Sequence, residues 1–440
     1  MDSQPAQLDS HPTQLDSQPD PSDSRALEPD DLSDDDTCMY TRILDPVDLC
    51  LPSLLAYNSL VLPVTPMPSV KVIPNDPATK PMSIPAPRNR KEALVSPWWP
   101  GYYQAELLEM KSLLANNTWQ LCPRSDVPAG VNVLRDRWAY SDKLSPGGTS
   151  IEKFKARLTV MGCFQQAGVD YTDTYASVMS TRTFRMLLQL YNSDKEHTML
   201  HWDVSTAFIH APLKEKVYMK QATGHEVTGK ESWVYLLVRA LYGTKQAAHA
   251  WQQHLKGLLA TVQFLPLAVD PATYLRRQGN AFAVVGTHVD DLFVVFNPAG
   301  AKLKDELWAH LNRKLTIKDL GVAEWTLQML IQRDAKAGKL KISQESFIVE
   351  VLRRFNMSNC SAAPTPAIDT GAEATMSESD CPVTTGQSEE IADLPFLKLI
   401  GCLWWLAQMS RLDHRSVSVA IRRFPLSPGT HGAPTYSLYQ

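Results

Sequence analysis

Two adjacent carboxylates, Asp290 and Asp291, interrupt an apolar segment that runs from Ala281 to Phe296. The apolar runs on both sides predict two buried strands joined by a tight turn. A turn gathers neighbouring side chains that a strand would send to opposite faces. Two carboxylates held close raise each other's pKa, and a bound divalent cation removes that cost. The pair therefore indicates a metal site, and the alternative is an acidic hairpin tip facing water.

A two-metal site for nucleotidyl transfer needs a further carboxylate from a neighbouring strand. The two ions of such a site lie about 3.5–4 Å apart and are bridged by carboxylates on rigid elements. Asp203 is the best candidate, because it ends an apolar strand expected from Met199 to Val204. Its alternative role is the N-cap of a following helix. The combination with the hairpin pair favours the metal site.

Short motifs around these acids follow one another in a fixed order from about Asn117 to Phe424. In them the chain resembles the reverse transcriptase of Ty1/copia-type retrotransposon polyproteins. The matching stretches are Asn117-Thr-Trp119, Lys155-Ala-Arg-Leu158, Gly168-Val-Asp-Tyr171, Asp203-Val-Ser-Thr-Ala-Phe208, Val217-Tyr-Met219, Ala240-Leu-Tyr-Gly-Thr-Lys-Gln246, Ala250-Trp251, Val289-Asp-Asp291, Lys318-Asp-Leu-Gly321, Ser343-Gln344, Thr365-Pro366, Leu399-Ile-Gly401 and Leu406-Ala407. Each motif alone is a weak signal, and their shared order is a strong one.

The resemblance implies an RNA-directed DNA polymerase with a right-hand fold of fingers, palm and thumb. It implies that Asp203, Asp290, Asp291 and the carbonyl group of Val204 hold two Mg²⁺ ions, with Mn²⁺ as the other possible metal. The implied partners are an RNA or DNA template-primer and a deoxynucleoside triphosphate (dNTP). The resemblance does not imply an oligomeric state.

The resemblance also assigns four substrate-binding residues. Lys155 and Arg157 share one face of a strand and match the fingers residues that hold the triphosphate; alone they indicate a solvated strand face. Phe208 matches the aromatic side chain that packs under the incoming sugar, and the alternative is a core aromatic on a helix. Gln246 matches the residue that supports the nascent base pair, and it is equally typical of a helix start.

Several positions depart from the pattern of the resembled family. Gln328 stands where a glycine precedes the primer-gripping hairpin, and a bulky side chain there keeps backbone from approaching the primer. The other departures are Val160-Met-Gly162, Thr244, Ala247-Ala-His249, Thr326, and Ser177, Ala222 and Leu412 in place of proline. They leave the three acidic residues intact but weaken the prediction for primer handling.

Charge and cysteine usage limit the class of protein. Residues 1–36 contain ten Asp, Glu28 and Arg25 and so carry a net charge of −10, which leaves +6 for the rest of a chain whose total is −4. That excess suits a nucleic-acid partner without requiring one. The seven cysteines form no Cys-x-x-Cys pair, which favours a reducing compartment, cytoplasm or nucleus, over a disulfide framework. No signal peptide or membrane span is expected.

Short strands mixed irregularly with helices predict an α+β fold. We expect a disordered acidic and Pro-rich leader over 1–97, fingers and palm over 98–342, a thumb-like helical region over 343–424 and an irregular tail over 425–440. Expected helices are 105–115, 181–191, 246–262, 302–315, 346–355 and 396–408. Expected strands are 134–140, 153–160, 199–204, 217–219 and 233–238, with one more hairpin turning at 336–338. The hairpin at 281–296 argues against a phosphoacceptor receiver domain, which has parallel βα alternation.

The rival interpretation keeps the fold without the activity. In it the chain is a decayed or host-retained remnant of a retroelement that binds nucleic acid weakly or not at all. The intact acids favour catalysis, whereas the altered primer hairpin favours decay. No RNase H carboxylate set is recognised after Phe424, which favours a fragment of an element and adds to the argument for decay.

Overall fold

The structure, a computed structural model, describes residues 77–145, 150–361 and 395–411. The helices are α1 (Arg90–Val95), α2 (Trp99–Ala115), α3 (Thr181–Ser193), α4 (Ala247–Thr261), α5 (Ala301–Asn312), α6 (Glu345–Arg354) and α8 (Phe396–Met409). The strands are β1 (Trp119–Cys122), β2 (Val133–Leu134), β3 (Asp136–Leu144), β4 (Ile151–Val160), β5 (Thr198–Val204), β6 (Pro212–Lys220), β7 (Val234–Arg239), β8 (Leu265–Leu267), β9 (Asp270–Gln278), β10 (Ala281–His288), β11 (Asp291–Phe296), β12 (Ile317–Val322), β13 (Trp325–Thr326), β14 (Met329–Asp334) and β15 (Lys339–Ser343). The α+β class expected from the sequence is confirmed.

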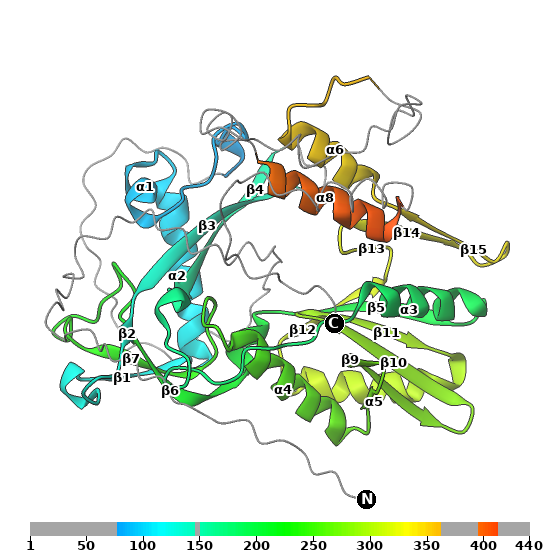
Figure 1. Ribbon diagram of the computed structural model, residues 1–440, viewed down its shortest axis with the longest axis horizontal. Helices are drawn as coiled ribbons and strands as arrows, with labels where there is room; N and C mark the ends of the chain where they lie inside the picture. Colours follow the sequence, from blue (N-terminus) through cyan, green and yellow to red (C-terminus); the bar gives the residue numbers. More distant parts are fainter. Residues whose placement is uncertain (1–76, 146–149, 362–394, 412–440) are drawn as a thin grey trace, which may run out of the picture. The chain divides into compact units, whose positions relative to one another are not determined.

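A six-stranded sheet in the order β12-β5-β11-β10-β9-β8 positions the acidic residues (Figure 1). Every neighbouring pair in it is antiparallel, which excludes the receiver-domain alternative. Alternate residues of a strand face opposite sides. Trp202 and Leu292 pack with α4 and α5 on one face, whereas Met199 and Phe293 pack with α3 on the other. Both faces are therefore buried, and the apolar runs of the sequence are explained.

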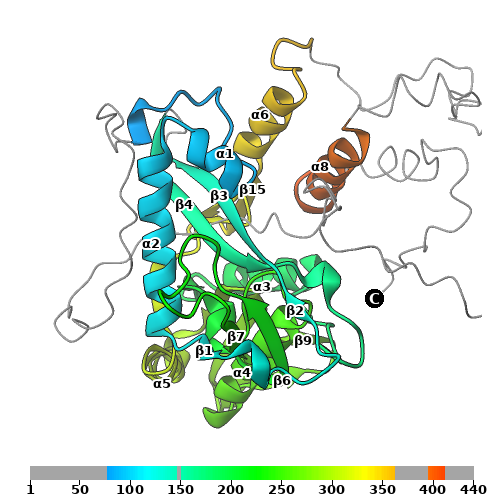
Figure 2. The same ribbon diagram turned by 90° about the vertical axis from the view of Figure 1, so that its left-hand side faces the viewer.

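A second part of the fold is built on the β3–β4 hairpin, against which α2 packs (Figure 2). Tyr102 of α2, Trp138 of β3 and Leu158 of β4 are almost fully buried in its core. Helix α2 has a proline in its first turn and ends at Asn116, followed by Asn117 in the left-handed region. The helix expected over 105–115 therefore ends where it was predicted to end.

The remaining described elements are the three-stranded sheet β13-β14-β15 and the helices α6 and α8. The last turn of α8 is tied to α3, because Arg185 Nη2 donates to the carbonyl oxygen of Met409 over 2.8 Å. Met409 also joins the apolar cluster between α3 and the central sheet. The C-terminal helix is thus anchored by packing and by one cation at its carbonyl end.

All the helices and strands expected within the described ranges are present, but regular structure begins before Trp98, where we expected it. Helix α1 lies inside the expected leader, and the side chain of Asn89 caps it by accepting from Glu92 N over 2.9 Å. Lys80 is also buried, and its ammonium pairs with Asp142. The proline-rich composition of this stretch gave no indication of the helix cap at Asn89 or of the buried ion pair of Lys80. Residues 1–76, 362–394 and 412–440 of the expected leader, thumb-like region and tail lie outside the described residues.

None of the described helices is both long and apolar enough to cross a membrane. Four cysteines fall within the described ranges, and all four are free: Cys122, Cys163, Cys360 and Cys402. This agrees with the absence of paired cysteine motifs in the sequence.

The turn between β13 and β14 carries backbone strain at the position where the resembled family has glycine. Leu327 and Gln328 both have positive φ, 47° and 61°. Two such residues between antiparallel strands form the type of turn that favours Gly or Asn. We predict that Gln328→Gly raises the free energy of unfolding by about 1 kcal/mol, because glycine adopts this conformation without a steric penalty.

Urea unfolding monitored by circular dichroism measures this change. The matched control is Gln332→Gly in the exposed part of β14, which removes the same side chain from an extended strand. That variant is expected to be less stable than the native protein, by about 0.5–1 kcal/mol. A destabilised Gln328→Gly protein would show that the turn is not strained.

Candidate active site

Strand pairing places Asp203 directly opposite Asp291. The two residues are register partners in the antiparallel β5–β11 ladder, which puts their Cα atoms about 4.5–5.5 Å apart. They lie on one face of the sheet, the face toward α3, because their neighbours Trp202 and Leu292 face α4 and α5. The expected approach of a third carboxylate from a neighbouring strand is therefore present.

Asp290 lies in the turn that joins β10 to β11, as expected for the hairpin. Its carbonyl oxygen accepts from Val204 N over 2.9 Å, so the turn is fastened to the end of β5. The preceding residue, Val289, has φ 58°, and its carbonyl oxygen accepts from Trp251 Nε1 of α4 over 2.6 Å. A β-branched residue in the left-handed region is strained and persists only where its surroundings hold it. The indole and Val204 supply that restraint.

Burial and mutual repulsion set the electrostatics of the three acids. Burial, followed by the neighbouring Asp291, raises the pKa of Asp290 to about 7. Burial and Asp291 also raise the pKa of Asp203. Asp203 is only 2 % exposed, and both of its carboxylate oxygens are buried without a hydrogen-bond partner. An N-cap would accept a backbone N–H, so the capping alternative for Asp203 fails. The pair at 290 and 291 is partly buried and is not a water-facing hairpin tip.

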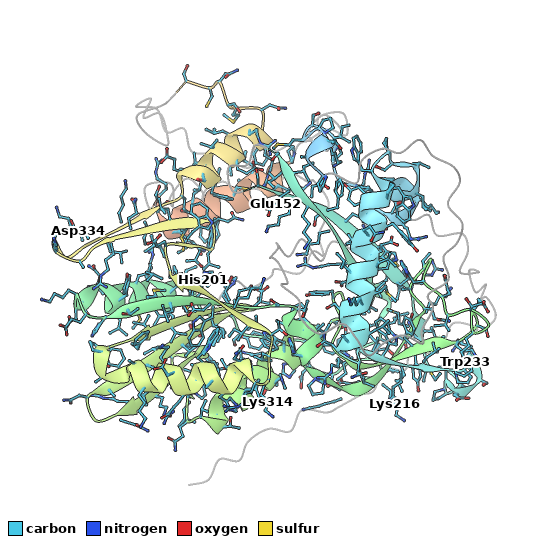
Figure 3. The ribbon with its side chains drawn as sticks, turned by 180° about the vertical axis from the view of Figure 1, so that it is seen from behind. Glu152, His201, Lys216, Trp233, Lys314 and Asp334 are labelled. Atoms are coloured by element: carbon cyan, nitrogen blue, oxygen red, sulfur yellow. The ribbon has the colours of Figure 1, made fainter. Side chains whose placement is uncertain are left out.

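Two neighbours of the acids, a histidine and a lysine, were missed in the sequence. His201 Nε2 lies 2.6 Å from Asp291 Oδ1, and its ring stacks on Phe293 with centroids 5.0 Å apart. Figure 3 labels His201. Lys318 is the register partner of Asp203 on β12 and lowers its pKa. His201 stands two residues before Asp203 and so shares its strand face, a period-2 signal that was available. Lys318 belongs to a matched motif, but only the strand pairing reveals its neighbour.

The acids fit a hard divalent cation in charge and donor type. Carboxylate and carbonyl oxygens are the ligands that Mg²⁺ prefers. The two unpartnered oxygens of Asp203 and the raised pKa of Asp290 are the marks of a site that lacks compensating positive charge. In the described ranges, however, no three or more His, Cys, Asp or Glu side chains are grouped closely enough to hold a metal ion.

Comparisons with known proteins identify the family of this chain. The family model described as reverse transcriptase (RNA-dependent DNA polymerase) matches residues 116–369, more than half of the chain. The chain belongs to this reverse transcriptase family. Membership confirms the polymerase fold class that the sequence motifs implied.

The curated relatives are retrotransposon polyproteins. The chain is 33% identical over 347 residues to the retrovirus-related Pol polyprotein from transposon TNT 1-94 of Nicotiana tabacum, covering 78% of this chain and 25% of that protein. It is 28% identical over 280 residues to the Pol polyprotein from transposon RE1 of Arabidopsis thaliana, covering 64% and 18%. The reverse transcriptase chain thus spans a quarter or less of these relatives.

One solved structure that resembles the chain is a foamy viral protease-reverse transcriptase in complex with double-stranded DNA. Identity is 12%, the TM-score is 0.33, and the match covers 76% of this chain and 44% of that one. The likeness is too distant to support an argument.

Lys155 and Arg157 lie on strand β4, close enough to the acids for their charges to act on them. Burial raises the pKa of Asp203 and of Asp290 overall. Lys155 opposes part of the rise at Asp203, and Arg157 opposes part of the rise at Asp290, so both cations act on the carboxylates. The guanidinium of Arg157 lies over the ring of Tyr242, 5.1 Å from its centroid. These contacts differ from the solvated strand face that was the alternative.

Glu109 on α2 is a further residue that the sequence did not single out. Its Oε1 is buried without a hydrogen-bond partner, and burial raises its pKa to about 7 against the opposing effect of Arg157 and Lys155. A lone Glu in a helical pattern gives no sign of this, because only the packing of α2 on β4 brings the three side chains together.

Phe208 and Gln246 are both buried in the structure. Phe208 lies in the short 3-10 helix η4 (Ala207–His210), packs into the core with α4 and contacts Tyr242 edge-on at 5.4 Å. As it stands it is a core aromatic. Gln246 precedes α4 but makes no side-chain cap. Its Nε2 donates to the Asp170 carbonyl oxygen over 2.9 Å, and its Oε1 accepts from Gln165 Nε2 over 3.0 Å.

The matched Tyr242-Gly243 dipeptide joins β4 to the start of α4. Val160 N donates to the Tyr242 carbonyl oxygen over 2.8 Å. A Cβ atom on Gly243, which has φ 88°, would lie 2.2 Å from the Val160 carbonyl oxygen. A side chain is therefore excluded at this crossing. Thr244, which departs from the family pattern, is accommodated because its hydroxyl donates to the Leu241 carbonyl oxygen over 2.9 Å.

The raised pKa of Asp290 makes a prediction about stability. Its carboxyl group keeps a proton in the folded state that the unfolded state releases, so stability falls as pH rises from its usual value of 3.8 toward 7. Asn cannot ionise. We predict that Asp290→Asn removes this fall and, in metal-free buffer at pH 8, is more stable than the native protein by about 1–3 kcal/mol.

Urea unfolding in EDTA at pH 5 and pH 8 tests this expectation. Asp173→Asn, at an exposed position, is the control and should keep the native pH dependence. Parallel pH profiles for the native and Asp290→Asn proteins would rule out a buried, protonated Asp290.

Proposed function

We propose that the chain is an RNA-directed DNA polymerase. In this reaction a primer 3′-hydroxyl attacks the α-phosphorus of a dNTP opposite an RNA or DNA template. A phosphodiester bond forms, and the bond to pyrophosphate breaks. The proposal rests on one observation above all: in a member of the reverse transcriptase family, Asp203 lies opposite Asp291 on adjacent strands and Asp290 occupies the adjoining turn.

The metal ligands of this proposal come from two strands and one turn. Asp203, Asp290, Asp291 and the Val204 carbonyl oxygen would hold two Mg²⁺ ions, or Mn²⁺, which activate the attacking hydroxyl and neutralise charge on the leaving group. His201 orients the Asp291 carboxylate through the contact at 2.6 Å. Trp251 holds the strained turn at Val289, which keeps Asp290 at the end of β5. Positive charge that arrives at the site lowers the raised pKa of Asp203 and of Asp290 and so favours their ionised forms.

Substrate binding is proposed for the residues around these acids. Lys155 and Arg157 contact the triphosphate, the guanidinium in a bidentate manner and the ammonium as a point charge. Glu109 lies beside both cations and balances their charge while the triphosphate is absent. Phe208 packs under the incoming sugar. Gln246 supports the nascent base pair through the segment at Gln165 and Asp170 that it holds.

The family's three-part division is proposed at the boundaries expected from the sequence. Residues 98–342 then comprise fingers and palm, with the palm formed by the central sheet. Residues 343–424 comprise a thumb-like region, of which α6 and α8 are described. The contact of Arg185 with the carbonyl end of α8 ties this region to the palm helix α3.

Primer extension by the full chain on poly(rA)/oligo(dT) tests the proposal. We predict Mg²⁺-dependent incorporation of dTMP that falls by at least about 10³-fold in Asp290→Ala/Asp291→Ala, since the carboxylates act as a unit. Asp173→Asn is the matched control and should retain activity. Chelation of the metal should stop the reaction in the native protein.

The same assay separates catalysis from the decayed-remnant alternative. Two observations favour decay, namely the strained Gln328 in the primer hairpin and the absence of a ready-made metal cluster in the described ranges. A folded native protein without incorporation, or one with equal incorporation in the double variant, would refute the polymerase proposal.

A second prediction concerns the sugar. We predict that Phe208→Ala lowers discrimination between dTTP and UTP by about tenfold, because the ring no longer crowds a 2′-hydroxyl. Since Phe208 is 6 % exposed in the core, the variant also loses about 3–5 kcal/mol of stability.

Phe208→Leu keeps most of the volume and serves as the second variant. Single-nucleotide incorporation measured as kcat/KM for both triphosphates gives the ratio. An unchanged ratio in an active Phe208→Leu enzyme, together with an unchanged ratio in Phe208→Ala, would remove Phe208 from the sugar site.

A further inference from the structure

A basic pocket of about 470 Å³ lies away from the three acids. It is lined by the end of α2, η4, the end of β7, α4 and the segment between α5 and β12. His254 belongs to α4, which packs on the face of the central sheet opposite to Asp203 and Asp291. Lys314 lies just beyond the end of α5 (Figure 3). The five ionisable side chains of the lining are His210, Arg239, His254, Arg313 and Lys314.

These side chains give the pocket positive charge without a counterion in the lining. No Asp or Glu is among its lining residues. Arg313 and Lys314 are exposed, and neither forms an ion pair with a residue in the described ranges. Burial lowers the pKa of both His210 and His254, and the positive charge of the nearby Arg239 lowers each further. A concave surface of one charge sign concentrates counterions.

Arg239 is held in place by the protein. Its Nε donates to the Asn116 carbonyl oxygen over 3.1 Å, and its Nη1 donates to the His210 carbonyl oxygen over 2.8 Å. These bonds fix the plane of the guanidinium and leave Nη2 for a further acceptor. A pre-oriented guanidinium is well suited to a phosphate group, since its planar fork matches two oxygens.

We propose that this pocket binds a phosphate group at a site separate from the three carboxylates. The group belongs either to the backbone of a bound nucleic acid or to free pyrophosphate. Arg239 supplies a fixed donor, Arg313 and Lys314 supply mobile charge at the rim, and His254 adds a ring nitrogen to the lining, whereas His210 Nε2 is already bonded to the Ser205 carbonyl oxygen. The simpler role of Arg239 as a cation at the carbonyl end of α2 leaves Arg313 and Lys314 without a function.

Binding measurements on the full chain in EDTA test the site, because chelation removes metal-dependent binding at the acids. The variant is Arg313→Glu/Lys314→Glu, which alters exposed side chains only. The matched control is Arg277→Glu/Lys302→Glu, which makes the same change of charge at exposed positions outside the lining. The probes are sodium pyrophosphate, by isothermal titration calorimetry, and fluorescein-labelled oligo(dT), by anisotropy.

We expect the pocket variant to weaken binding of at least one probe by about tenfold while the control stays within about twofold of the native protein. Loss confined to pyrophosphate identifies a free phosphate as the ligand, and loss with oligo(dT) identifies the nucleic-acid backbone. The neutral variant Arg313→Gln/Lys314→Gln should give an intermediate loss. Equal losses in the pocket variant and the control, or no loss with either probe, would overturn the proposal.

Discussion

The antiparallel pairing of β5 with β11 is the constraint on which the site depends. It sets Asp203 opposite Asp291, and the pleat directs both to the same face of the sheet. Burial of these acids and the like charge of Asp291 oppose folding, and together they raise the pKa of Asp203 and of Asp290. The apolar contacts of Trp202, Leu292 and their neighbours on the other face keep the strands paired. A slip of either strand by one residue in register would turn its carboxylate into that core.

Contacts from elsewhere in the chain hold the ends of these strands. Trp251 Nε1 of α4 donates to the carbonyl oxygen of Val289 in the strained turn. The next carbonyl oxygen of that turn, at Asp290, accepts from Val204 N at the end of β5. The turn that precedes α4 meets β4 at Gly243, where no side chain fits. Helix α4 therefore holds the acidic turn through Trp251, and the turn before this helix holds the end of the strand that carries Lys155 and Arg157.

The sequence predicted most of the fold because its signals are local. The apolar runs around Asp290 gave the hairpin, and the asparagines after α2 gave the helix stop. It also predicted Asp203 beside the pair, because Asp203 ends an apolar strand and a two-metal site needs a further carboxylate from a neighbouring strand. It missed α1, because a single Asn89 cap is a weak signal in a proline-rich stretch. Lys318 and Glu109 were missed because only pairing and packing over long distances bring them to the site.

Backbone strain divides into two kinds in this chain. Thr206 and Val289, both β-branched, have φ 53° and 58° and flank the acids on η4 and the hairpin turn. A positive φ is unfavourable for β-branched residues, so contacts with the surroundings must hold the backbone there. At Val289, Trp251 and Val204 make these contacts. Gln328 has the same conformation in a two-residue turn between short strands, where glycine would relieve the strain. At Val289, specific contacts from Trp251 and from the end of β5 hold the strained backbone beside the acids. At Gln328 the strain lies in a turn whose conformation glycine would adopt without penalty, so the two kinds of strain occur at different sites of the chain.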